Sequence, residues 1–259
     1  MSILSDGLSA LRLGNSEIDS LIAPREKEVN ALLAQYVAEI ELFNPAYGLV
    51  ADGDIREIVT RHILDSLAPM GIIYRQVEHE RGQQRKTPQE QKTPQGRENQ
   101  SQGDESSDTP FAQTIQIADA GSGAGLPGIP LAIAMPDCHF TLIERMGRRA
   151  GFLWNVKAKL GLANVGVEEG ELEKAAVGFF NCVTFRAFKP LEPKLLKSLF
   201  RVCAANGFLA AYKARKEKIT EEMSPLEKYA HWEAIPYEVP FLNEERNLVI
   251  VKPKKKLSE

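Results

Sequence analysis

A dense run of small residues in the middle of the chain has the composition of a ligand-binding turn. Residues 115–118 form a short apolar run, Asp119 follows it, and glycines then occupy positions 121, 123 and 125. Glycine permits positive φ angles and lets a ligand approach the backbone without meeting a Cβ atom. Pro127 stands where a helix could begin, and the first N–H groups of a helix have no partner within it. The order of strand, glycine turn and helix start predicts a site for a nucleotide-type cofactor.

An acidic residue after the next apolar run supports this interpretation. Residues 139–144, HFTLIE, predict a second strand that ends in Glu144. A carboxylate in that place can accept hydrogen bonds from both hydroxyl groups of a ribose. The dinucleotide fingerprint G-x-G-x-x-G would need glycine at position 126, which is Leu126, so a dehydrogenase is disfavoured. A strand–helix turn that binds nothing is the plainer alternative, and the agreement of loop, strand and acid weighs against it.

The composition indicates an ordered globular protein. The chain has 259 residues, of which 43% are hydrophobic and 26% charged, enough for a core in one domain with an extension or in two small domains. The net charge of −3 gives no general attraction to nucleic acid, so any RNA contact must come from local patches. The three cysteines are scattered and odd in number, which predicts neither disulfides nor a metal site. Since no signal peptide and no apolar run of about 18 residues is present, we expect a cytoplasmic protein without a membrane span.

The chain before the glycine turn divides into two parts of different character. Residues 1–71 predict a helical extension, with a partly helical lead to residue 23, one helix from Pro24 to Asn44-Pro45, and a second from Asp52 or Asp54 to Pro69. Residues 72–113 predict a disordered surface insert, because positions 76–109 are almost free of large apolar side chains. A basic tail, residues 253–259, ends the chain.

Strands and helices alternate over residues 114–252, which predicts an α/β domain with parallel strands. We expect strands near 115–119, 139–144, 164–168, 180–185, 207–213, 233–239 and 247–252. We expect helices near 128–135, 147–161, 192–204 and 215–229. The last two strands leave no room for a crossover helix, so a hairpin with a turn at residues 243–245 predicts an antiparallel final strand.

Four segments together resemble one family of enzymes. The spacing Asp-x-Gly-x-Gly-x-Gly resembles the first motif of class I methyltransferases that depend on S-adenosylmethionine. Added to GSGAGLPGIP (121–130), the segments HILDSL (62–67), TFRAF (184–188) and ERNLVIV (245–251) resemble the bacterial ribosomal small-subunit methyltransferase G family, also called glucose-inhibited division protein B. The resemblance covers residues 24–71 and 114–252. It implies a Rossmann-like α/β fold whose seven-stranded, mostly parallel sheet ends in an antiparallel strand.

The resemblance also implies an activity, namely S-adenosylmethionine-dependent methylation of N7 of one guanine in 16S ribosomal RNA. Guanine N7 carries an in-plane lone pair and no proton, so transfer needs positioning and electrostatics more than a general base. We therefore assign no catalytic residue and take Arg186 as the candidate for positioning. The partner is 16S ribosomal RNA or the small ribosomal subunit, with no metal, no membrane and a monomeric enzyme expected.

The residues themselves and the resemblance together give the expected site residues. The expected cofactor-binding residues are Asp119, Gly121, Ser122, Gly123, Gly125, Leu126, Glu144, Leu172, Glu173 and Arg186. The candidates for substrate or RNA binding are Arg61, His62, Arg148, Lys213 and Arg246. The chain departs from the family at Glu171, which stands where a basic residue is usual and so reverses the charge beside the pocket.

Other interpretations remain open at this point. A methyltransferase with a small-molecule or protein substrate fits the net charge, and a non-catalytic RNA-binding assembly factor could retain the cofactor pocket. Arg186 could form an ion pair at the sheet edge, and Arg246 could pair with Glu244 or Glu245 on the surface. His62 and Asp65 share a helix face, where a structural hydrogen bond or packing is the expected role.

Overall fold

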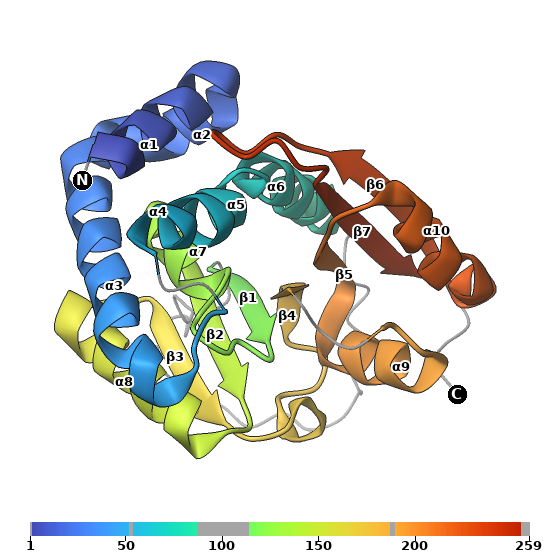
Figure 1. The fold of residues 1–259 in the computed structure, drawn as a ribbon. Coiled ribbons are helices and arrows are strands. Elements are labelled where there is room, and N and C mark those ends of the chain that lie inside the picture. The colour runs from blue at the N-terminus through green and yellow to red at the C-terminus, as the bar shows by residue number, and fades with distance from the viewer. Residues whose placement is uncertain (1, 52–53, 87–113, 187–189, 255–259) are drawn as a thin grey trace, which may run out of the picture.

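The computed structural model describes residues 2–51, 54–86, 114–186 and 190–254. Seven strands form one sheet in the order β3-β2-β1-β4-β5-β7-β6, at the centre of the molecule (Figure 1). The strands are β1 (Ile115–Ala120), β2 (Cys138–Glu144), β3 (Val165–Glu169), β4 (Phe180–Arg186), β5 (Cys203–Lys213), β6 (Ala230–Pro236) and β7 (Asn247–Pro253).

The pairing of the strands confirms the predicted fold. Strands β1 to β5 are parallel to one another, whereas β7 is antiparallel to both β5 and β6. The carboxyl ends of β1 to β5 therefore meet at one edge of the sheet, where open α/β folds bind ligands. The predicted hairpin is also present, but Pro236 pairs with Asn247. Residues 237–246 thus form a β6–β7 loop that is longer than the turn predicted at 243–245.

Helices and apolar side chains cover both faces of the sheet. Four helices belong to the α/β domain: α7 (Gly128–Ala134), α8 (Gly147–Leu160), α9 (Pro193–Val202) and α10 (Lys216–Met223). Side chains alternate along β1, so that Ile117 joins the apolar cluster with α7, α8 and the N-terminal helices, while Ala118 joins the cluster with α9 and α10. Both clusters are well buried, so the strand ends are held on a rigid support.

The N-terminal extension is more helical than expected. Its elements are α1 (Ser2–Gly14), α2 (Ser16–Ile22), η1 (Ala23–Arg25), α3 (Glu26–Tyr47), α4 (Ile55–Glu57), the π-helical segment η2 (Ile58–Leu64), α5 (Asp65–Leu67) and α6 (Met70–Lys86). The expected end of α3 at Asn44-Pro45 is wrong, because the helix runs through Pro45 and ends where Gly48 takes a left-handed conformation. Asp54, one of the two expected caps, accepts the N–H of Arg56.

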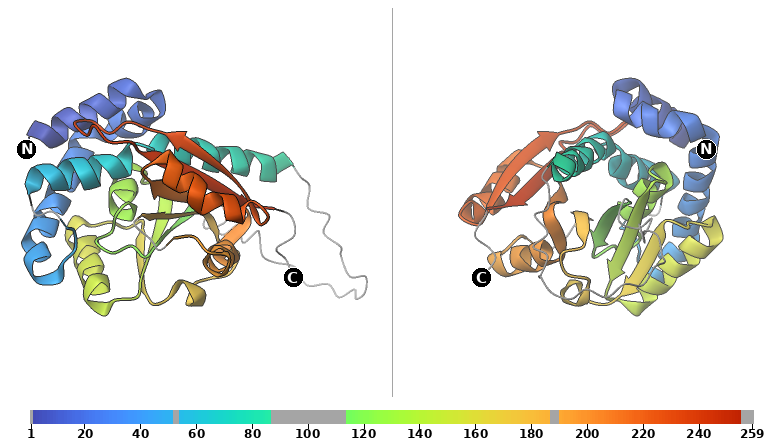
Figure 2. Two further views of the ribbon diagram at one scale, coloured as in Figure 1. Left: turned by 45° about the vertical axis from the view of Figure 1, so that its right-hand side comes forward. Right: turned by 180° about the vertical axis from the view of Figure 1, so that it is seen from behind.

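Helix α6 begins directly after the predicted helix end at Pro69 and continues into the predicted insert. Residues 72–86 are helical, because Ile73 and Val77 are buried and Glu80 pairs with Lys252 of β7. The rest of the predicted insert, residues 87–113, and residues 255–259 of the predicted tail lie outside the described residues. Figure 2 shows α6 beside the β6–β7 hairpin.

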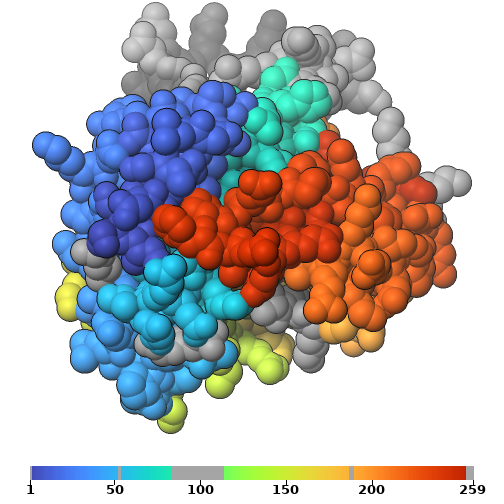
Figure 3. All heavy atoms as spheres, turned by 45° about the horizontal axis from the view of Figure 1, so that its top comes forward, coloured from blue at the N-terminus to red at the C-terminus, as the bar shows by residue number. Residues whose placement is uncertain are grey.

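The N-terminal extension and the β6–β7 loop meet over the carboxyl edge of the sheet. Figure 3 shows the loop lying between the first helices and the segment that contains η2. In the described part of the chain, no helix is long and apolar enough to cross a membrane. Nor do the described residues contain a group of three or more His, Cys, Asp or Glu side chains that could hold a metal ion.

Candidate functional site

Two adjoining cavities open at the carboxyl edge of the sheet. The larger, of about 550 Å³, is lined by residues 49–51, η2, the glycine loop, Arg186, the end of β5 and the β6–β7 loop. The smaller, of about 430 Å³, lies at the ends of β2 and β3. Gly121 and Arg149 line both cavities, so the two form one site with two compartments. Each compartment has the size of a small-ligand pocket.

The glycine loop forms the floor between the compartments. Gly121 and Gly123 have φ angles of 69° and 59°, a region that favours glycine. The N–H groups of Gly121 and Ser122 both donate to the carbonyl of Ile143 in β2. A Cβ atom on Gly123 would meet nothing closer than 3.9 Å, so a side chain there would project into open space. Hydrogen bonds to β2 therefore fix the loop, and no side chain covers its surface at Gly121 and Gly123.

Two of the expected cofactor-binding residues lie behind the glycine loop, away from the cavities, and support it. Asp119 is 1% exposed and lines neither cavity, and its Oδ2 accepts hydrogen bonds from Ser122 Oγ at 2.6 Å and Gly128 N at 3.0 Å. Burial raises the pKa of Asp119 to about 6. Gly125 also lines neither cavity, and a Cβ there would lie 2.6 Å from Ile129. Both residues therefore shape the loop, and neither faces one of the two cavities.

Tyr36 links the glycine loop to the N-terminal extension. Its side chain lies on α3, is fully buried, and donates a hydrogen bond to the carbonyl of Ala124. Burial raises the pKa of the Tyr36 hydroxyl well above its usual value, so the hydroxyl stays protonated as a donor. The extension thus contributes directly to the shape of the loop.

Glu144 lies where the two compartments join. Its Oε2 accepts the N–H of Gly123 and its Oε1 accepts the N–H of Met146, both at 2.8 Å. The side chain is nearly buried and lines the smaller cavity. A carboxylate oxygen has more than one lone-pair direction, so Glu144 can still accept hydrogen bonds from a ligand. The structure thus places this acid beside the glycine loop, as the sequence predicted.

The smaller cavity has a mixed lining of apolar and charged side chains. Leu172 and Glu173 begin the short helix η4 (Leu172–Lys174) after β3 and line this cavity. Glu171, the unexpected acid, lines it too, and Arg145 faces it from the turn after β2. A lining of apolar side chains with a few polar groups suits a flat, nitrogen-rich ring such as adenine.

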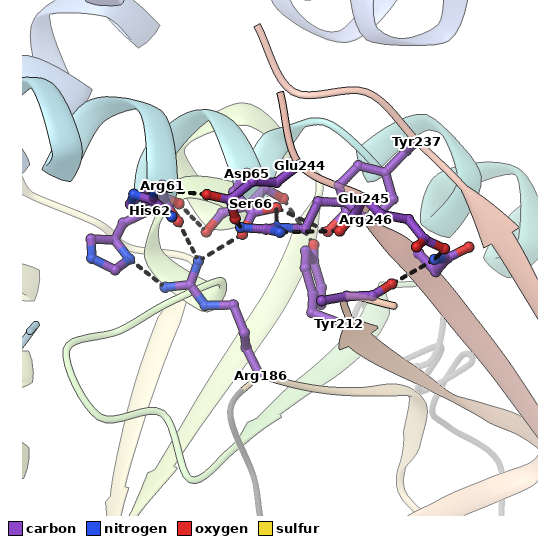
Figure 4. A network of polar contacts seen from close by, with 12 residues as sticks. Arg61, His62, Asp65, Ser66, Arg186, Tyr212, Tyr237, Glu244, Glu245 and Arg246 are labelled. Atoms are coloured by element: carbon purple, nitrogen blue, oxygen red, sulfur yellow. Dashed lines mark hydrogen bonds and ion pairs between the residues drawn. The ribbon is translucent and has the colours of Figure 1, made fainter. Parts of the chain in front are cut away.

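The larger cavity contains a network of charged residues from three separated parts of the chain (Figure 4). Arg186, at the end of β4, reaches the N-terminal extension, where its guanidinium lies 3.3 Å from the carbonyl of Arg61 and 3.2 Å from His62 Nδ1. It also lies 3.5 Å from Asp65 Oδ2. Only 15% of the Arg186 side chain is exposed, so these contacts fix it at the cavity wall.

Asp65 joins a second arginine to this network. Its Oδ1 lies 3.5 Å from Arg246 Nε and accepts a hydrogen bond from the Tyr237 hydroxyl at 3.0 Å. Tyr212 packs edge-on against Tyr237 and donates to the carbonyl of Ser66. Burial raises the pKa of both tyrosines, which therefore remain neutral and cannot act as bases.

The other predicted substrate contacts lie in different environments. Arg61 and His62 line the larger cavity, as does Lys213, whose ammonium group pairs with Glu222 of α10 at 2.8 Å. Arg148 lines neither cavity and instead lies near the carbonyl of Ala46, over the ring of Tyr47. Arg148 thus contacts α3, and the structure does not bring it to the site.

Sequence reasoning missed four residues that the structure places at the site. Tyr36 and Tyr237 gave no local signal, and Asp65 was expected to form a structural hydrogen bond or to pack, whereas it also contacts two arginines of the site. Arg149 was not among the predicted site residues. It lines both cavities, and its Nε is buried with no hydrogen-bond partner among the described residues.

The chain is similar to a set of named enzymes along most of its length. A family model described as rRNA small subunit methyltransferase G (GidB) matches residues 105–249. A "Ribosomal RNA small subunit methyltransferase G" of Treponema denticola is 36% identical over 230 residues, which cover 86% of this chain and 86% of that protein. A protein of the same name from Cellvibrio japonicus is 34% identical and covers 96% of this chain and 99% of its own length. A third, from Klebsiella pneumoniae subsp. pneumoniae, is 34% identical over 90% of this chain and 93% of its own length.

Proposed function

Because the chain belongs to the rRNA small subunit methyltransferase G family, we propose that it methylates N7 of one guanine in 16S ribosomal RNA, with S-adenosylmethionine as the methyl donor. The observation that carries the proposal is the joined pair of cavities. The smaller holds Glu144 beside Gly121, and the larger is lined by the glycine loop together with arginines and neutral tyrosines. A cofactor site that opens into a basic cavity suits transfer to a nucleic acid.

The smaller compartment and the glycine loop fit the adenosine part of the cofactor. Glu144 would accept hydrogen bonds from the ribose hydroxyls, and Leu172 and Glu173 would contact the adenine. The bare surface at Gly121 and Gly123 leaves room for the amino-acid part, which would extend toward the larger compartment. When bound, S-adenosylmethionine supplies a methyl group on a positively charged sulfur.

The residues of the larger compartment would position the target base. Guanine N7 needs no deprotonation, and the tyrosines here are held neutral, so the site requires orientation and not a general base. Arg186 is held at the end of β4, beside the glycine loop, and can hydrogen-bond to an acceptor on the substrate. We propose Arg186 as the residue that orients the substrate at this wall.

The same proposal specifies the partner and the place of action. We expect the enzyme to bind 16S ribosomal RNA or the small ribosomal subunit, and to do so as a monomer in the cytoplasm. Arg61 and Arg246, at the rim of the larger cavity, are the proposed contacts to the RNA backbone.

A transfer assay tests this function. The protein is mixed with methyl-labelled S-adenosylmethionine and undermethylated small-subunit particles, or their naked RNA, and the RNA is digested to nucleosides. We expect label in 7-methylguanosine. Label in another nucleoside would keep the methyltransferase and contradict the N7 assignment.

The absence of label would favour one of two alternatives. Cofactor binding without transfer to any ribosomal particle would indicate a non-catalytic assembly factor. Transfer to a small molecule or protein, unaffected by added RNA, would indicate a methyltransferase of another class.

A further inference from the structure

One exposed carboxylate bridges two arginines at the rim of the larger cavity. Oε1 of Glu244 lies 2.7 Å from Arg61 Nη2, and Oε2 lies 3.0 Å from Arg246 Nη2. Arg61 comes from η2 and Arg246 from the β6–β7 loop, so the bridge joins the two segments that border the cavity (Figure 4). The arginines hold between them an anionic group with two oxygens.

We propose that Arg61 and Arg246 form a binding position for a phosphate of the RNA backbone, and that Glu244 occupies this position when RNA is absent. The inference rests on the proposed RNA substrate. Guanidinium groups bind carboxylates and phosphates with the same planar fork of N–H donors, so a position that holds a carboxylate also suits a phosphodiester. RNA would then displace the Glu244 side chain as it enters the cavity.

The two acids paired with Arg246 differ in solvent exposure, and this difference explains why the Glu244 side chain can move away from the arginines. The Glu244 side chain is 39% exposed, whereas Asp65, the other acid near Arg246, is only 7% exposed. Ion pairs of exposed side chains contribute little to stability, while a buried pair is costly to break. Asp65 would therefore keep Arg246 in place while the Glu244 carboxylate is exchanged for phosphate.

The remaining charges support the same assignment. Arg61 has a second acid nearby, Glu57, but its Oε1 lies 3.8 Å from Arg61 Nε, farther than the Glu244 contact. Removing Glu244 would leave the two guanidinium groups with an excess of positive charge. The β6–β7 loop would still be attached, since Tyr237 bonds to Asp65 and its N–H donates to the carbonyl of Arg246.

The test compares two glutamates of the β6–β7 loop, Glu244 and Glu238. Glu244→Gln removes the carboxylate that bridges the two arginines, whereas Glu238→Gln makes the same change in net charge at an exposed position that forms no ion pair among the described residues. The binding of undermethylated small-subunit particles is measured by filter retention at several salt concentrations. Steady-state kinetics of methyl transfer are recorded with the same particles.

We expect Glu244→Gln to tighten particle binding and lower KM by about three- to tenfold with kcat unchanged, because phosphate no longer competes with a carboxylate. The slope of log affinity against log salt should steepen by about one. Glu238→Gln should change affinity less than twofold. Adding Arg61→Gln should remove most of the gain from Glu244→Gln, because one half of the site is then missing.

Weaker or unchanged binding by Glu244→Gln would overturn the inference, as would an equal gain in Glu238→Gln. If the wild type methylates particles but Glu244→Gln behaves like the control, only this inference fails. If the wild type neither binds nor methylates particles or RNA, the proposed function fails and this inference with it.

Discussion

The carboxylate of Asp65 lies 3.5 Å from the guanidinium of Arg186, although 121 residues separate them in the sequence. Asp65 belongs to α5 of the N-terminal extension, and Arg186 ends β4 of the sheet. The second oxygen of Asp65 contacts Arg246 and Tyr237 from the β6–β7 loop. One nearly buried carboxylate therefore fixes two arginines that come from different parts of the fold.

We expect Asp65→Asn to lower kcat of methyl transfer about 100-fold at saturating cofactor, because Arg186 loses the charge that holds it and a displacement of about 1 Å has that effect. Arg186→Ala should cause a similar loss while the fold remains intact. If Asp65 acts through Arg186, adding Asp65→Asn to Arg186→Ala should lower kcat less than threefold further.

Tyr237→Phe is a milder change than Asp65→Asn or Arg186→Ala, since it removes one hydrogen bond to Asp65 and leaves the charges in place. It should lower kcat only a few-fold. Losses that multiply in the Asp65–Arg186 double variant, with a matching drop in thermal unfolding temperature, would indicate a purely structural role and contradict the prediction.

The strand, glycine loop and acid could be predicted from sequence because each is a local pattern. The apolar run before Asp119, the spacing of the glycines and the acid at Glu144 lie within 30 residues of one another, and parallel strands bring their ends together. Arg186 and Arg246 were found only through the family resemblance. Tyr237 had no signal at all, because its role depends on Asp65, 172 residues away.

The boundary of the predicted insert failed for a different physical reason. Residues 76–86 contain many Glu, Gln and Arg side chains, which suggested disorder by their polarity. The same residue types are good helix formers, and the pairing of Glu80 with Lys252 attaches this helix to β7. A tertiary contact therefore stabilises a helix here, which the local composition alone did not predict.

Tyr36→Phe should loosen the glycine loop without altering its sequence. The change removes the hydrogen bond to the buried carbonyl of Ala124, which should lower the free energy of unfolding by about 1–2 kcal/mol. Cofactor affinity should fall several-fold, because the loop is less well fixed. Urea unfolding and titration calorimetry measure the two effects.

The matched control is Tyr47→Phe on the same helix, whose hydroxyl has no hydrogen-bond partner among the described residues. It should leave both quantities unchanged. Equal effects from the two substitutions would show that the hydroxyl of Tyr36 has no special role.

Glu144→Gln should remove the selectivity for ribose hydroxyls. The wild type should bind adenosine about 10- to 100-fold more tightly than 2′,3′-dideoxyadenosine, the range expected for hydrogen bonds to a charged acceptor. In Glu144→Gln the two ligands should bind with similar affinity. Glu168→Gln, on the exposed end of β3, is the control and should retain the wild-type ratio. A ratio that survives in Glu144→Gln would place the ribose elsewhere.

Asp119→Asn should change how stability depends on pH. Burial raises the pKa of Asp119 from 3.8 to about 6, so the folded protein binds its proton more tightly than the unfolded chain does. The stability that this proton provides is present below about pH 4 and is lost as pH rises toward 6, by about 3 kcal/mol. The asparagine variant does not titrate and can still accept the hydrogen bonds of Ser122 and Gly128. Relative to that variant, the wild type should therefore be more stable at pH 4.5 than at pH 7.5 in urea unfolding. Parallel pH profiles for the two proteins would show that Asp119 titrates as an ordinary exposed acid.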